Sequence, residues 1–148
     1  MGTRRLDMGC NSHLTIEVRG LIEHRPDNWE MWASDVEECR DYRLYAAMAG
    51  VRIGASNIVP VAEPRGLPAD ASEESENWHH DHSEHSETWL TVEEFHEAVR
   101  LAQQISDVKE STIIYPIAKE WAAIGKVLDV LEEVWGVGNV RLVVGFDN

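Results

Sequence analysis

The sequence predicts a single α+β domain in which a small, mostly antiparallel sheet packs against about three helices. Near both ends of the chain, apolar residues alternate with polar ones, which is the period of a half-buried strand. Between these ends, apolar residues recur at steps of three and four, which is the period of a helix. Strand and helix patterns do not alternate along the chain, so a parallel sheet of repeated β-α-β units is not expected.

The chain has 148 residues, a length that usually forms one domain with its own core. We expect residues 8–148 to form this domain and residues 1–7 to be a leader or disordered. The longest apolar runs are interrupted within a few residues, so none is long enough to cross a bilayer. Only two cysteines occur, Cys10 and Cys39, and no apolar signal segment precedes them, which favours free thiols and a cytoplasmic location.

The first strand is expected from His13, because three apolar residues that follow share one face: Leu14, Ile16 and Val18. His13 lies on the polar face of this strand. A second strand is expected over residues 29–33, after a turn signal at residues 26–28. A short helix should begin near Asp41 and end at Gly50. Residues 53–85 show no sustained periodicity and are expected to form a long irregular loop, which is often functional.

Two further helices and a strand are expected in the second half of the chain. Thr91 and Glu94 form a capping box, which predicts a helix from Val92 to about Ile105. A third helix should begin near Pro116 and bury one apolar stripe against the core. The members of this stripe are Ile117, Trp121, Ile124, Leu128, Leu131 and Trp135. Alternation over residues 140–146 predicts a last strand, which we expect to pair with the first.

The net charge of −14 disfavours extended phosphate backbones and anionic lipid surfaces as partners. No Lys or Arg lies between Arg65 and Arg100, whereas that stretch carries ten acidic residues. Four arginines lie in the preceding part of the chain: Arg40, Arg43, Arg52 and Arg65. They could form a local positive pocket for a compact anion such as a nucleotide, although ordinary surface arginines give the same pattern.

Five segments together resemble a family of small phage and prophage proteins. These segments are MGCNSHLTIEV, RDYRLYAAMAGVR, RGLP, HSETWL and VRLVVGFDN. Members of that family have MGCDIH at the start, RNYDLFAxxAGVR in the first helix and HSxSWL before the second, and the resemblance spans most of the chain from Met8. This sequence departs from the pattern at Asn11 and Ser12, where an acidic and an aliphatic residue are usual. The resemblance implies an accessory role in the host bacterial cytoplasm, such as disarming a host defence by capturing or cleaving a nucleotide signal.

His13 and His85 are the candidate catalytic residues, since one imidazole could accept a proton from a 2′-hydroxyl or water while the other protonates the leaving oxygen. His85 and Ser86 precede the capping box, so we expect them near a helix N-terminus that could hold a phosphate. Trp89 could stack on a base or anchor the core. The residues expected to bind the ligand are Arg40, Tyr42, Arg52, Arg65, Ser86, Thr88 and Trp89. At least one of these arginines should lie near His85 and Trp89.

Three functions are compatible with these features. The first is a metal-independent phosphodiesterase that acts on a small nucleotide, without a cofactor. The second is a non-catalytic sponge that sequesters the nucleotide. The third is a metal-binding or protein-interaction module, for which the run from His79 to His85 supplies four imidazoles and Asp81. Assembly into a homo-oligomer is compatible with all three.

Overall fold

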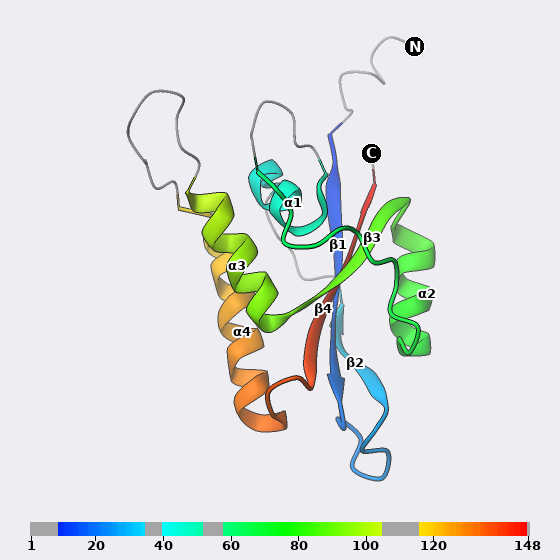
Figure 1. Cartoon of the computed structure of the whole chain (residues 1–148). Helices are drawn as coiled ribbons and strands as arrows, with labels where there is room; N and C mark the ends of the chain where they lie inside the picture. Colours follow the sequence, from blue (N-terminus) through cyan, green and yellow to red (C-terminus); the bar gives the residue numbers. More distant parts are fainter. Residues whose placement is uncertain (1–8, 35–39, 52–57, 105–115, 148) are drawn as a thin grey trace, which may run out of the picture.

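The computed structural model describes four strands, which form one antiparallel sheet in the order β2-β1-β4-β3 (Figure 1). It describes residues 9–34, 40–51, 58–104 and 116–147. The central strands are β1 (Asn11–Arg19) and β4 (Val140–Asp147), and the edge strands are β2 (Trp29–Ser34) and β3 (His85–Thr91). The α+β class and the pairing of the first and last strands are confirmed. The leader expected at residues 1–7 lies outside the described residues.

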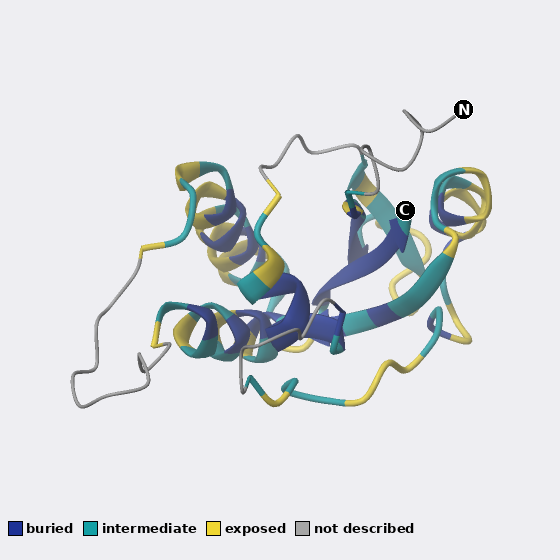
Figure 2. Ribbon diagram, turned by 90° about the horizontal axis from the view of Figure 1, so that it is seen from above, coloured by how far each residue is buried: buried dark blue, intermediate teal, exposed yellow. Residues whose placement is uncertain are grey.

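Helices cover both faces of the sheet (Figures 1 and 2). One face carries α1 (Tyr42–Ala49), α3 (Val92–Gln103) and α4 (Lys119–Trp135), and the other carries α2 (Glu73–His82). The expectation of an irregular loop over residues 53–85 is wrong in its second half, because α2 occupies residues 73–82. Helix α2 also brings the described helices to four, where about three were expected.

The main core lies between β1, β4 and the three-helix face. Leu14, Ile16 and Val18 of β1 are buried there, opposite Val144, Leu142 and Val140 of β4. In α4, Trp121 and Leu128 are fully buried and Trp135 packs half-buried against the same cluster, so the predicted apolar stripe is confirmed. Fully burying an apolar side chain of this size contributes about 1.5–3 kcal/mol to the free energy of folding.

The layer between α2 and the sheet is polar. Glu17 of β1 is fully buried, and its Oε2 accepts a hydrogen bond of 2.7 Å from the backbone N–H of Ser72, the N-cap of α2. Its Oε1 accepts one of 2.8 Å from Nε of Arg141 in β4. The other contacts of α2 with the sheet include a hydrogen bond between His79 and Thr15. Because these buried groups have polar partners, a helix with almost no apolar residues can pack on the sheet.

The helix ends follow local sequence signals. Thr91 and Glu94 form the predicted capping box, and α3 begins at Val92 as expected. Gly50 ends α1 in the left-handed region at φ 69°, a conformation that favours glycine. The onset of α4 is at Lys119, three residues after Pro116, and no side chain caps its first turn.

Candidate functional site

The two histidines predicted to act together lie on opposite faces of the sheet. His13 is opposite Gly145 of β4, on the face covered by α2, where its ring lies near that of His82. His85 is opposite the next residue of β4, Phe146, and stacks on that ring at 6.3 Å on the main-core side. Neighbouring residues of a strand point to opposite faces, so the expectation that His13 and His85 share a cavity is not met.

His13 has a different partner, the carboxylate of Asp147 at the end of β4. Nε2 of His13 lies 2.6 Å from Oδ2 of Asp147. An ionised carboxylate can only accept a hydrogen bond, so Nε2 carries the proton and Nδ1 of the neutral ring keeps its lone pair. Within the described part of the chain, no hydrogen-bond partner of Nδ1 is found. This arrangement prepares His13 to accept a proton.

An arginine is linked to the same carboxylate. Nδ2 of Asn11 donates to Oδ1 of Asp147 at 3.3 Å, and Nε of Arg40 donates to Oδ1 of Asn11 at 2.8 Å. The guanidinium of Arg40 also lies against Gly9, where an added Cβ would be 2.0 Å from Nη1. Arg40 is exposed and forms no ion pair with a described carboxylate. It therefore supplies a positive charge that is linked to His13 through Asn11 and Asp147.

His82 of α2 is the second imidazole at this end of the sheet. Its ring centroid lies 5.8 Å from that of His13. Nδ1 of His82 donates a hydrogen bond of 2.7 Å to the carbonyl of Trp78, which leaves Nε2 available for a ligand. The ring of Trp78 stacks on His82 at 3.8 Å, and an aromatic face stabilises a cationic ring. We call His13, His79, His82 and Asp147 the histidine cluster.

His79 forms the buried floor of the cluster. Its side chain is fully buried, with Nε2 3.1 Å from the hydroxyl of Thr15 and Nδ1 2.9 Å from that of Ser83. Burial, followed by repulsion from His13 and His82, lowers the pKa of His79 to about 4. His79 is therefore neutral at pH 7, and its role is to hold α2 on the sheet beside His13.

A glycine allows α2 to end close to β4. A Cβ at Gly145 would lie 2.1 Å from Oγ of Ser83, the C-cap residue of α2, and 2.5 Å from its Cβ. Any other residue at position 145 would displace Ser83, which bonds to His79. The absence of a side chain at Gly145 thus sets the distance between the end of α2 and His13.

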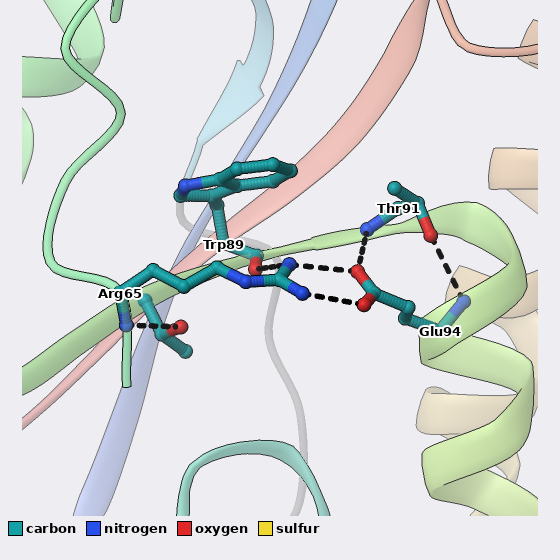
Figure 3. A network of polar contacts seen from close by, with 5 residues as sticks. Arg65, Trp89, Thr91 and Glu94 are labelled. Carbon is teal, nitrogen blue, oxygen red and sulfur yellow. Dashed lines mark hydrogen bonds and ion pairs between the residues drawn. The ribbon is translucent and has the colours of Figure 1, made fainter. Parts of the chain in front are cut away.

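Arg65 approaches Trp89, as predicted, but at a separate place (Figure 3). Its guanidinium lies 4.5 Å from the Trp89 ring centroid, and its backbone N–H donates to the hydroxyl of Thr88. Both terminal nitrogens bind the carboxylate of Glu94, at 2.7 and 2.5 Å. These hydrogen bonds raise the pKa of Arg65 and lower that of Glu94. The charge of Arg65 is balanced by Glu94, so its main role is to tie residues 65–66 to the start of α3.

The other predicted ligand-binding residues are dispersed. The hydroxyl of Tyr42 accepts a hydrogen bond of 3.2 Å from the backbone N–H of Cys10, next to the start of β1. Ser86 adopts a positive φ of 57° in the bulge of β3, where its hydroxyl lies 2.9 Å from Nδ1 of His85. The expectation that His85 and Ser86 lie at a helix N-terminus is wrong, because they are the first two residues of β3 and the rest of that strand separates them from α3. Arg52 lies outside the described residues.

The histidine-rich run does not converge on one point. His79 faces the sheet, His80 is exposed, His82 faces His13, and His85 lies on the opposite face of the sheet. Among the described residues, no group of three or more His, Cys, Asp or Glu side chains is placed to hold a metal ion. No described helix is long and apolar enough to cross a membrane.

Sequence reasoning did not identify Asp147, and it considered His79 and His82 only as candidate metal ligands. The signal for Asp147 was present, since pairing of the first and last strands makes residues diagonal to one another neighbours on one face. The signal for His82 was the charge order of residues 73–82, where acidic residues come first and histidines come last. This order suits the dipole of a helix that ends at His82.

Comparison of the chain with known protein families, curated proteins and solved structures finds no match. The functional assignment is therefore based on the chemistry of the site.

Proposed function

We propose that this chain is a phage-type accessory protein that cleaves a small phosphodiester, of the cyclic-nucleotide class used as immune signals in the host bacterial cytoplasm. The observation that carries the proposal is the geometry of His13, which is 2.6 Å from Asp147 and has a second imidazole, His82, at 5.8 Å between ring centroids. Two imidazoles at this separation can reach two oxygens of one phosphate group. His82 thus takes the role that the sequence assigned to His85.

The reaction needs one proton acceptor and one proton donor. Nδ1 of His13 takes the proton from the 2′-hydroxyl of the nucleotide, and the hydroxyl oxygen forms a bond to phosphorus. The bond from phosphorus to the 5′-oxygen breaks, and protonated His82 donates its Nε2 proton to that oxygen. Asp147 stabilises the imidazolium that forms on His13, and Trp78 stabilises that on His82.

Binding of the anion is supported by Arg40. Its guanidinium is connected to the cluster through Asn11 and has no carboxylate partner among the described residues, so a phosphate would meet an unbalanced positive charge there. The acidic remainder of the protein repels longer nucleic acids, which favours a compact ligand over a polymer.

The test is incubation with a panel of cyclic mononucleotides and dinucleotides, with and without chelator, followed by chromatography of the free and heat-released pools. We expect product from the wild type in both conditions. His13→Gln and His82→Gln should each lower the rate by ~10² to 10⁴, the usual effect of removing one proton-transfer group. His80→Gln is the matched control on the exposed side of α2 and should retain full activity.

The outcomes separate the alternatives. Release of intact nucleotide by heat, with no product, would identify a sponge. Loss of activity with chelator would indicate a metal enzyme. Full activity in the double variant His13→Ala and His82→Ala would refute the acid/base mechanism, and loss of activity in His85→Gln alone would return the assignment to His85.

A further inference from the structure

Helix α4 carries a second apolar stripe, which points largely away from the core, although Val127 also packs against the core cluster. The members of the stripe are Ala123, Val127, Val130 and Val134, and Val137 continues the spacing just beyond the helix. The steps of four and three residues keep the four helical members on one line, about 110° around the helix from the core-facing stripe at 100° per residue. Val130, Val134 and Val137 are 54%, 64% and 88% exposed. The stripe is therefore a contiguous apolar surface.

The composition of this stripe is unusual for a face in contact with water. Valine is a weaker helix former than the Ala, Glu or Lys that usually fill exposed helix positions, so local helix stability does not explain it. Apolar patches of this kind on a protein surface mark sites of association. Helix α4 packs on α3, β4 and β1 and lies at the margin of the helical layer, where a further helix can approach it (Figure 1).

We propose that this stripe is the seam of a homodimer in which two copies of α4 pack antiparallel across a two-fold axis. The charges beside the stripe favour this partner and this direction. Lys126 precedes Val127 and Glu133 precedes Val134, so the two residues occupy the same position of the heptad repeat. Residues at this position meet each other in antiparallel helix pairs. Lys126 of each copy then lies beside Glu133 of the other, which gives two opposite-charge pairs.

The alternative directions and partners fit less well. In a parallel pair, Lys126 and Glu133 would lie beside Leu131 and Gly138, which carry no charge. Both Lys126 and Glu133 are exposed, and neither forms an ion pair with another described residue. A two-fold seam also needs a self-complementary surface. In the antiparallel pair, Val127 of one copy lies opposite Val130 of the other, and Ala123 lies opposite Val134. Each pairing occurs twice, so the seam has four matched layers.

The test is the molecular mass of the full chain in solution, measured by sedimentation equilibrium over a wide concentration range. The wild type should show a monomer–dimer equilibrium. Val130→Asp should raise the dissociation constant at least about 100-fold, because the two-fold axis places two carboxylates in the apolar seam. Val59→Asp, at an exposed valine elsewhere on the surface, is the matched control and should leave the constant unchanged.

Charge exchange tests the direction of the helices. Lys126→Glu alone and Glu133→Lys alone should each weaken the dimer, and the double variant should restore it, because the pairs form again with their signs reversed. A wild type that stays monomeric at every concentration would overturn the proposal. A dimer that Val130→Asp does not weaken, or a double variant no better than the single ones, would overturn it equally.

Discussion

Replacement of His79 by glutamine tests whether α2 is held on the sheet by a buried neutral imidazole. His79 is fully buried, and burial is the main cause that lowers its pKa from the ordinary 6.5 to about 4. In the unfolded chain the pKa returns to its ordinary value, so the unfolded state binds the proton at higher pH than the folded state. The stabilisation is complete above about pH 6.5 and is lost as the pH falls towards 4.

The gap between the two pKa values sets the magnitude. Each tenfold change in an equilibrium constant corresponds to about 1.4 kcal/mol, so the gap amounts to about 3 kcal/mol of unfolding free energy. The wild type should lose this amount between pH 6.5 and 4, in addition to any change from its carboxylates. Glutamine cannot be protonated, so His79→Gln should lack this part of the pH dependence. At neutral pH the variant should be less stable by about 1–2 kcal/mol, because it keeps only one of two hydroxyl partners.

The assay is urea unfolding monitored by tryptophan fluorescence, repeated at steps of pH. The curves of unfolding free energy against pH for the wild type and His79→Gln should converge and then cross as the pH falls, because the wild type loses about 3 kcal/mol by pH 4 and is only about 1–2 kcal/mol more stable at neutral pH. His80→Gln removes an exposed histidine from the same helix and should follow the wild type. Parallel curves for the wild type and His79→Gln would show that His79 has an ordinary pKa in the folded protein. The interpretation of His79 as a buried neutral imidazole would then be wrong.

Two further substitutions test how the chain is held around the sites. Gly145→Ala should lower the unfolding free energy by about 1–3 kcal/mol, because its Cβ would lie 2.1 Å from Oγ of Ser83. Adding Ser83→Gly to Gly145→Ala should recover part of this loss. If the changes in unfolding free energy measured in urea for the two single variants simply add in the double variant, the proposed clash is refuted. Glu94→Ala should cost about 1–2 kcal/mol, since it removes both the ion pair with Arg65 and the hydrogen bond that the Glu94 carboxylate accepts from the backbone N–H of Thr91. Thermal unfolding measures this loss, and a melting temperature equal to that of the wild type would refute it.

Apolar periodicity predicted most of the elements that pack on the main core, and the capping box predicted α3. The first and last strands, α3 and α4 each bury one apolar face there, so their sequences repeat with the period of the backbone. The capping box of α3 was predicted to the residue because it depends on side chains three positions apart.

The elements that sequence reasoning missed do not bury apolar faces of that kind. The buried members of α2 are Ser75 and His79, which an apolar pattern cannot detect. In β3 a bulge at Ser86 shifts the register between His85 and Thr88, so alternation is interrupted within seven residues. The candidate site depends on both elements and on the register of β1 with β4. The proximity of His13 and His82 therefore could not be predicted from their spacing in the sequence.

The polar layer under α2 also connects a distant residue to the proposed activity. Glu17 fixes the start of α2 through Ser72, although it is four residues from His13 along β1, or about 13 Å. Glu17→Gln removes the buried counter-charge of Arg141, which keeps an ion pair with the exposed Asp70, and should cost up to about 3–5 kcal/mol of stability. It should also lower turnover per folded molecule, because a shift of α2 moves His82 relative to His13.

Leu128→Ala is the control that separates these two effects of Glu17→Gln. It should cost a comparable ~2–5 kcal/mol, but on the other face of the sheet and without displacing α2. Its turnover per folded molecule should equal that of the wild type. If Glu17→Gln and Leu128→Ala lose turnover only in proportion to the unfolded fraction, the buried carboxylate stabilises the fold but does not position His82. If Glu17→Gln alone loses more, the placement of α2 on its polar layer is part of the catalytic arrangement, and Glu17 acts on the reaction through His82.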